Sequence, residues 1–142
     1  MSWIRSIVTG PDSVGTVTLI TSRAIPTGPF SASAGADTAL LVVEPTVAGV
    51  HDLERVLSTT EHFGVPAMVV INKADLNPRR SDEVAAFCAE RGIKVAGRIP
   101  YDTVVTEAMV RGQPVTAYAD GAVSGALREV WERVREHLAL KP

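Results

Sequence analysis

Cysteine is nearly absent from this chain of 142 residues, since Cys88 is its only one. A single thiol excludes a disulfide within the chain, and it excludes an iron–sulfur cluster held by this chain's own thiolates. Aromatic residues make up only 5% of the chain. No apolar run reaches the roughly 18 residues that a membrane-spanning helix needs. The sequence therefore predicts neither a disulfide framework nor a membrane span.

A strong excess of one charge is also missing, because the formal net charge is −2. That value gives no general attraction to nucleic acid or to an anionic membrane. The N-terminus lacks the charged and then apolar layout of a secretory signal, so we expect a cytoplasmic protein. The three histidines, His51, His62 and His137, have no metal-ligand spacing among themselves or with Cys88, and we predict no metal site formed by protein ligands.

Hydrophobic residues make up 46% of the chain and charged residues 21%, a balance typical of globular proteins. At this length we expect one domain, residues 1–142, with a core of its own. Cys88 falls on the apolar stripe of a predicted helix, which favours a core side chain over a reactive thiol.

Residues 1–35 are the atypical part of the domain. Two segments rich in β-branched residues, Trp3 to Thr9 and Val14 to Thr21, predict strands. Between them, Gly10 to Val17 has the glycine spacing of a phosphate-binding loop. Position 16 is a threonine where such a loop has the lysine that reaches the phosphates, so a plain connection between strands is favoured.

The most informative stretch is an apolar run that ends in polar residues. Val65 to Ile71 is nearly continuous in apolar residues, which predicts a parallel strand covered on both faces. Asn72, Lys73 and Asp75 follow it directly. Ligands of open α/β sheets bind beyond the carboxyl ends of the strands. An asparagine that donates and accepts, next to an aspartate that only accepts, matches the edge of a purine base.

Strands and helices alternate around this stretch. Further strands are predicted over Ala39 to Val43 and Ile93 to Ile99, and a helix over Gly49 to Phe63. Ser81 is the predicted N-cap of the next helix, with Asp82 and Glu83 in its first turn. The last elements are a short helix that ends at Gly112 and a longer one from about Asp120. This order predicts an α/β fold with a mainly parallel sheet and flanking helices.

The last predicted helix has apolar residues at helical spacing, Val123, Leu127, Val130, Trp131, Val134 and Leu138. Its other face predicts ion pairs four residues apart, Arg128 with Glu132 and Glu129 with Arg133. Asp52 and Arg55 lie three apart on the earlier helix and predict an exposed ion pair.

Several motifs in a fixed order carry a family resemblance. They are the run from Ala36 to Val56 with Glu44-Pro45-Thr46 inside it, His62 to Pro66, Asn72-Lys73-Ala74-Asp75-Leu76-Asn77, and Ile99-Pro100-Tyr101-Asp102. Over residues 30 to about 118 the chain resembles the MinD/ParA-like P-loop ATPases (CobQ/CobB/MinD/ParA), and most of all the subgroup with an inserted ferredoxin domain. The resemblance implies a P-loop NTPase-like sheet and ATP with Mg²⁺ as cofactor. It also implies that ATP binds between the two subunits of a dimer.

The resemblance also implies which residues meet the nucleotide. Asn72 is expected to face the adenine, and the segment with Pro100 and Asp102 is expected to close over the base. For Lys73 the alternatives are contact with the ribose, packing of its stem beneath the base, or a solvated side chain without a ligand. With Asp75, these make up the predicted nucleotide-binding set, and no catalytic residue is assigned.

Three features of that family are missing or altered in the sequence. A Gly-rich loop with its lysine is not found, and Ile25-Pro26-Thr27-Gly28-Pro29 is at best an altered form of the family's magnesium segment. The cysteine-rich insert is absent too. The phosphate loop, its lysine and the magnesium segment supply almost all catalysis of phosphoryl transfer. We therefore expect a domain that resembles the C-terminal half of the ATPase and comes from a truncated or split protein. Alone, this domain is not expected to hydrolyse ATP.

Three interpretations stay open at this point. Asn72-Lys73-x-Asp75 is also the guanine-recognition tetrad of GTPases, although the surrounding motifs favour adenine. Asn72 and Asp75 also suit the capping of a turn without any ligand. A third interpretation is an interaction module that binds no nucleotide and pairs with another chain through a sheet edge or an apolar face.

Overall fold

The computed structural model describes residues 5–8, 16–21 and 37–138. Two predicted N-terminal strands are present, as β1 (Arg5–Val8) and β2 (Thr16–Thr21). The glycine-spaced loop between them, residues 10–15, and the segment Ile25 to Pro29 lie outside the described residues.

The sheet has five strands in the order β1-β2-β3-β4-β5. Its other strands are β3 (Thr38–Val43), β4 (Ala67–Asn72) and β5 (Lys94–Ile99). β1 pairs antiparallel with β2, and all the other pairs are parallel. The predicted α/β fold with a mainly parallel sheet is therefore confirmed.

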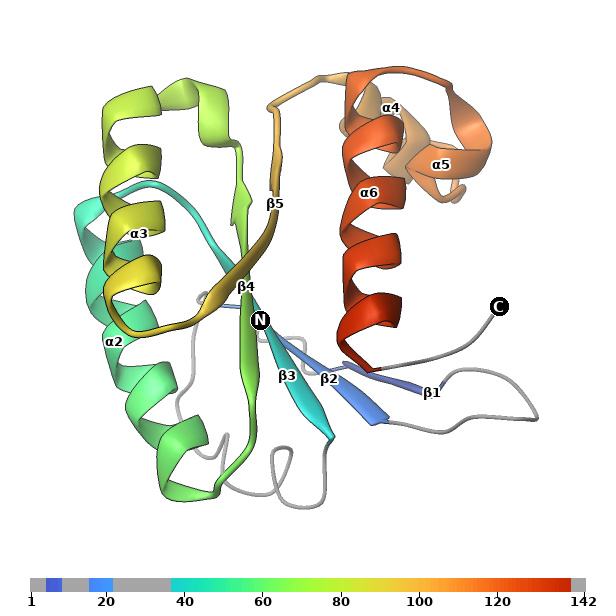
Figure 1. Ribbon diagram of the computed structural model, residues 1–142. Coiled ribbons are helices and arrows are strands. Elements are labelled where there is room, and N and C mark those ends of the chain that lie inside the picture. The colour runs from blue at the N-terminus through green and yellow to red at the C-terminus, as the bar shows by residue number, and fades with distance from the viewer. Residues whose placement is uncertain (1–4, 9–15, 22–36, 139–142) are drawn as a thin grey trace.

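Helices cover both faces of this sheet. α2 (Val47–His62) connects β3 to β4, and α3 (Pro78–Glu90) connects β4 to β5. Each new strand adds on the same side of the last, so crossovers of one hand place both helices on one face. Figure 1 shows α2 and α3 together on that face and α6 (Ala122–His137) on the other.

β4 lies between two apolar clusters. On the side of α2 and α3, Val69 and Ile71 pack in one cluster, and on the side of α6, Met68 and Val70 pack in the other. All four are at most 1% exposed. The continuous apolar run of this strand follows from that position, because neither of its faces meets water.

Specific residues set the ends of α2. Thr46 is the N-cap, and its hydroxyl oxygen accepts a hydrogen bond from the Gly49 amide at 2.9 Å. Beyond the last turn, Gly64 adopts a φ of 65°, which costs a glycine little. The predicted termination at Gly64 is confirmed, and the exposed Asp52–Arg55 ion pair is present at 3.9 Å.

The predicted start of α3 at Ser81 was wrong. The helix begins at Pro78, and Asn77 is its N-cap, with the Asn77 side chain accepting from the Arg80 amide at 3.0 Å. Proline suits the first turn because its missing N–H has no helical partner there. Ser81 is buried within the helix and donates its hydroxyl to the Ala74 carbonyl at 2.8 Å.

Two short helices separate β5 from α6. α4 (Val104–Val110) is followed by Gly112 with a φ of 65°, as the sequence predicted. A second short helix, α5 (Val115–Tyr118), begins after Pro114 and was not predicted. Proline blocks the continuation of a helix on its N-terminal side, yet it suits the residue before a new first turn.

The predicted ion pairs of α6 are not the ones that form. Arg128 pairs with Asp120 at 2.9 Å, and Arg135 pairs with Glu132 at 3.1 Å. Arg133 instead donates to the Ala96 carbonyl of β5 at 2.8 Å. Trp131, predicted on the inner stripe, is 41% exposed, whereas Val130 and Val134 are buried.

The contact between α6 and β5 is close at one point. A Cβ placed on Gly97 would lie 2.6 Å from Cγ2 of Val130. The residue before it, Ala96, has no register partner on β4. The register shifts there, so that Val95 pairs with Val69 and Gly97 pairs with Val70. Arg133 supplies the hydrogen bond that the Ala96 carbonyl accepts.

Cys88 is fully buried in the cluster under α2 and α3, as predicted. Burial raises the pKa of its thiol to about 11, although the charge of Arg91 acts in the opposite direction. The reactive species of cysteine is the thiolate, so the native thiol is an inert core side chain at neutral pH.

We predict that Gly97→Ala lowers the free energy of unfolding by about 1–3 kcal/mol, since the added methyl group must push the stiff Val130 side chain aside. Gly125→Ala in α6 is the matched control, because a Cβ on Gly125 would have no atom within 4 Å apart from its two chain neighbours and the nearby backbone of its own helix. That variant is expected to be as stable as the parent or more stable, by up to about 1 kcal/mol. Urea unfolding measures both, and equal stability of the two variants would contradict the close contact.

Candidate functional site

The predicted site residues lie at one edge of the sheet. We use the term mouth for the residues that follow β3, β4 and β5, namely Glu44–Thr46, Asn72–Asp75 and Pro100–Asp102. Parallel strands bring their carboxyl ends to the same edge, and Figure 1 shows these three ends at the top of the view. All five predicted residues, Asn72, Lys73, Asp75, Pro100 and Asp102, therefore belong to the mouth.

Asn72 is the last residue of β4 and pairs in register with Ile99 of β5. It is half-buried, whereas the four residues before it are buried. Its side-chain Oδ1 accepts a hydrogen bond from the Lys73 amide at 3.0 Å. Its amide nitrogen has no hydrogen-bond partner among the described residues, so two N–H donors remain for a ligand.

Lys73 turns the chain immediately after β4. Its φ of 51° is the only positive φ of a non-glycine residue in the described part of the chain. Left-handed backbone in such a residue is uncommon and clusters at functional sites. Its ammonium lies 2.9 Å from Oε1 of Glu44, and both side chains are about one third exposed, 32% and 33%. Lys73 thus ties the end of β4 to the end of β3.

Asp75 makes the corresponding tie to β5. Its Oδ1 accepts a hydrogen bond from the Tyr101 amide at 2.7 Å. Asp102, two residues after Pro100, accepts with Oδ1 from the Val104 amide at 2.9 Å and so starts α4. Pro100 is half-buried. The three segments of the mouth are therefore held together by the Glu44–Lys73 ion pair and the Asp75–Tyr101 hydrogen bond.

The turn after β3 depends on a glycine. The Thr46 amide donates to the Glu44 carbonyl at 2.8 Å. A Cβ on Gly49 would collide with that same carbonyl oxygen. This close approach of α2 to the chain at Glu44 fixes the backbone from which the Glu44 carboxylate reaches Lys73.

The charges at the mouth are mostly negative. Glu44, Asp75 and Asp102 contribute carboxylates, and Lys73 contributes the one cation of these three segments. Arg79 and Arg80, which follow on α3, both pair with Glu83 at 3.1 Å. No group of three or more histidine, cysteine or acidic side chains among the described residues is arranged to hold a metal ion.

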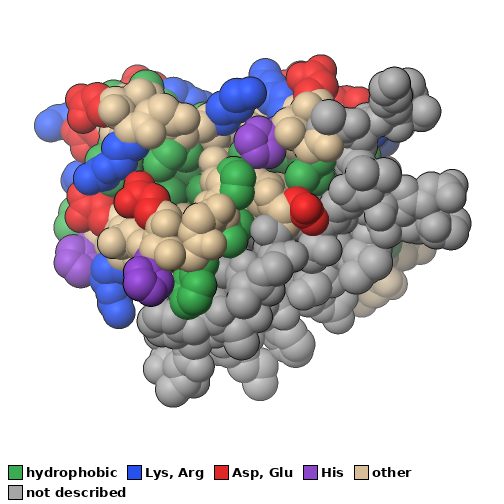
Figure 2. Space-filling view, turned by 60° about the horizontal axis from the view of Figure 1, so that its bottom comes forward, with side chains coloured by type: hydrophobic (Ala, Val, Ile, Leu, Met, Phe, Trp, Pro, Cys, Tyr) green, Lys and Arg blue, Asp and Glu red, His purple; other side chains and the backbone are tan. Residues whose placement is uncertain are grey.

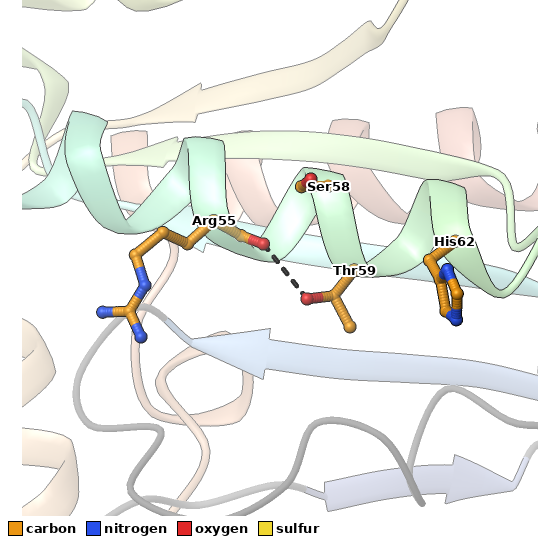
Figure 3. A pocket seen from close by; sticks show the side chains of 4 residues that line it. All are labelled: Arg55, Ser58, Thr59 and His62. Atoms are coloured by element: carbon orange, nitrogen blue, oxygen red, sulfur yellow. Dashed lines mark hydrogen bonds between the residues drawn. The ribbon is translucent and has the colours of Figure 1, made fainter.

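A groove lies elsewhere, on the outer side of α2. It has a volume of about 560 Å³ and is lined by Arg55, Ser58, Thr59 and His62. Figure 3 shows Arg55, Thr59 and His62 projecting from the same side of the helix, with the Thr59 hydroxyl donating to the Arg55 carbonyl at 3.1 Å. The N-cap of α2, Thr46, belongs to the mouth, whereas the groove lies along the second half of the helix. No motif in the sequence indicated this groove.

At the opposite edge of the sheet, the described residues carry side chains of both charges (Figure 2). Figure 2 brings that edge forward, and blue and red side chains are interspersed over the described residues seen there. In the described part of the chain, no helix has the length and hydropathy required to cross a membrane.

Sequence comparison finds relatives of unassigned function. The chain is 25% identical over 132 residues to the uncharacterized protein MJ0578 of Methanocaldococcus jannaschii, which covers 93% of this chain and 40% of that protein. It is 28% identical over 85 residues to the uncharacterized protein MJ0579 of the same organism, covering 60% of this chain and 27% of the relative. No family model matches the chain.

Structural comparison finds MinD and ParA proteins. The MinD cell division protein of Aquifex aeolicus matches with a TM-score of 0.63 and 22% identity, over 74% of this chain and 46% of its own. MinD of Pyrococcus horikoshii, solved as a complex with Mg-ADP, matches with a TM-score of 0.63 and 20% identity, over 75% of this chain and 44% of that protein. A ParA family ATPase of Chlorobium tepidum matches with a TM-score of 0.52 and 20% identity, over 70% of this chain and 41% of that protein.

These matches show the fold. The described part of the chain has the α/β architecture of the MinD/ParA P-loop ATPases, as the motif resemblance implied. The chain spans less than half the length of the proteins it matches. The resemblance to the subgroup with an inserted ferredoxin domain, which the motifs favoured, stays a prediction.

The Asp75–Tyr101 tie generates a test. We predict that Asp75→Ala speeds the hydrogen exchange of the Tyr101 amide, because that N–H loses its acceptor. Global stability should fall by no more than about 1.5 kcal/mol, the usual net contribution of one hydrogen bond. Asp82→Ala, which removes an exposed ion pair with Arg98, is the control and should leave Tyr101 exchange unchanged. Equal exchange rates in both variants would show that the tie does not hold β5 to β4.

Proposed function

We propose that this chain binds a purine nucleotide at the mouth, with adenine as the preferred base, and that ATP is the nucleotide concerned. The observation that carries the proposal is the half-buried Asn72, whose amide nitrogen has no partner among the described residues at the carboxyl end of the central strand. Ligands of open α/β sheets bind at this edge. Support comes from the fold it shares with MinD of Pyrococcus horikoshii, which was solved with Mg-ADP.

The chemistry of Asn72 suits adenine. An asparagine amide can donate to a ring nitrogen of adenine and accept from its exocyclic amino group. The Asn72 amide nitrogen supplies the donor, and Oδ1 keeps a second lone pair beside the one that accepts from the Lys73 amide. That same hydrogen bond holds the amide in place, so little side-chain entropy is lost when a base binds.

Asp75 argues against guanine. Guanine presents two neighbouring N–H groups, which a free carboxylate accepts with its two oxygens. Here the Tyr101 amide already occupies Oδ1 of Asp75 at 2.7 Å. Guanine recognition would have to share that oxygen or break the tie to β5. GTP binding is thus the weaker alternative, even though Asn72, Lys73 and Asp75 match the guanine tetrad.

The proposal includes binding without hydrolysis by this chain alone. Phosphoryl transfer requires backbone amides, a lysine and Mg²⁺ around the phosphates. The sequence has threonine at position 16, where a phosphate loop has lysine. We propose that a second chain, either another copy or a missing N-terminal half, supplies the phosphate-binding groups and the magnesium site. Cytoplasmic location belongs to the same proposal.

An interaction module that binds no nucleotide is the second candidate. Met109 and Val110 on α4 favour it, because they are 73% and 82% exposed, unusual values for large apolar side chains. Its other basis, an open sheet edge, is weaker. β5 is the last strand of the described sheet, yet its edge carries an unpaired Ala96 at a register shift, the Arg133 hydrogen bond and two exposed cations, Lys94 and Arg98. Such features block pairing with another strand.

Calorimetric titration separates the candidates. We predict saturable binding of ATP up to millimolar concentration, weaker binding of GTP, and a loss of at least about fivefold in ATP affinity in Asn72→Ala, as the removal of an amide paired with a ligand costs about 1–3 kcal/mol. Asn77→Ala is the control, since it removes an amide that caps α3. That variant should lose about 1 kcal/mol of stability and keep its affinity.

Three outcomes would contradict parts of the proposal. Absence of saturable binding for both nucleotides favours the interaction module. Tighter binding of GTP than of ATP favours the guanine tetrad. Phosphate release above background by the pure chain would refute the part of the proposal that concerns hydrolysis.

A further inference from the structure

We propose that the mouth selects the nucleoside part of its ligand and repels the phosphates, so that this chain alone binds adenosine more tightly than ATP. The inference rests on the proposed function, because it concerns the same site. It differs from that proposal in the order of affinities it requires, since a site for ATP would ordinarily gain affinity from the phosphates.

The first ground is the one cation of the mouth. A phosphate is held by ammonium, guanidinium or backbone N–H groups that are free to turn toward it. The Lys73 ammonium is already 2.9 Å from a Glu44 carboxylate oxygen. The ammonium keeps further N–H donors, but a phosphate that accepts from them would lie beside the Glu44 carboxylate.

Three backbone amides of the mouth are also engaged. The Thr46 amide donates to the Glu44 carbonyl, the Lys73 amide to Asn72, and the Tyr101 amide to Asp75. At the N-termini of α2 and α4 one amide each, that of Gly49 and that of Val104, donates to a side chain, Thr46 and Asp102 respectively. Helix N-termini often bind phosphate, but the acceptor at α4 is itself a carboxylate.

The remaining charges repel anions. Asp75 and Asp102 add two carboxylates that no cation of the described residues neutralises within 4 Å. The nearby Arg79 and Arg80 share the single carboxylate of Glu83, and the one positive charge left over does not offset both aspartates. Adenosine has no charge to be repelled, whereas ATP carries several negative charges at neutral pH. Each added phosphate therefore raises the electrostatic free energy of the complex, and salt screens this term.

The test is a titration of the pure chain with adenosine, AMP, ADP and ATP, in EDTA so that no divalent cation neutralises the phosphates. We expect affinity to fall along that series, with adenosine at least about fivefold tighter than ATP in 10 mM salt, a difference that screening reduces to less than about twofold in 0.5 M salt.

Charge variants sharpen the result. Glu44→Gln removes one carboxylate and frees Lys73, so the ratio of ATP to adenosine affinity should rise by about threefold or more. Glu61→Gln makes the same change of charge on the exposed far end of α2, and the ratio should stay as in the parent protein.

The possible failures are distinct. If ATP binds more tightly than adenosine in EDTA, the nucleoside selection is overturned while nucleotide binding at the mouth stands. If the ratio rises equally in both variants, the selection does not arise from the Glu44–Lys73 pair and this inference is overturned as well. If none of the four ligands binds, the proposed function itself has failed, and this inference with it.

Discussion

The burial of β4 on both faces is the constraint on which the rest of this structure depends. A strand between two apolar clusters needs helices on either side, and the order of the strands places α2 and α3 together on one face, so α6 must cover the other. The polar residues of the chain's most distinctive motif begin where this burial ends. Asn72 is the first residue along β4 beyond the buried run, and its position is therefore fixed by packing rather than by a flexible loop.

Two ties then shape the edge where the strands end. The Glu44–Lys73 ion pair joins β3 to β4, and the Asp75–Tyr101 hydrogen bond joins β4 to β5. Both engage residues that the sequence assigned to the ligand. The motif thus has a structural role as well as the proposed binding role, which leaves the Asn72 amide as its most available polar group. This division of roles gives the motif a structural function at a site whose described residues offer few groups for holding phosphate.

Much of the fold was predictable, because the signals for it are local. The apolar run of β4, the helical spacing of α2 and the glycines after α2 and α4 each act within a few residues. Ser81 and Asn77 show where local signals end, since both are good caps, and only the distant carbonyl of Ala74 explains why Ser81 is buried instead. The partners of Lys73 and Arg133 come from other strands, which no spacing along the chain can indicate. The residues that line the groove on α2 all come from that helix, but helical spacing of exposed polar residues does not by itself indicate a groove.

The central claim is that a purine base settles against the Asn72 amide at the mouth. The most direct measurement is the change in nuclear magnetic resonance shifts of the ¹⁵N-labelled chain as adenosine is added. The account predicts that the side-chain NH₂ signals of Asn72 and the backbone amide of Tyr101 shift together and saturate, while the amides of Arg55 and His62 in the α2 groove do not move. Shifts confined to that groove, or an Asn72 signal that stays unchanged while other signals saturate, would contradict it.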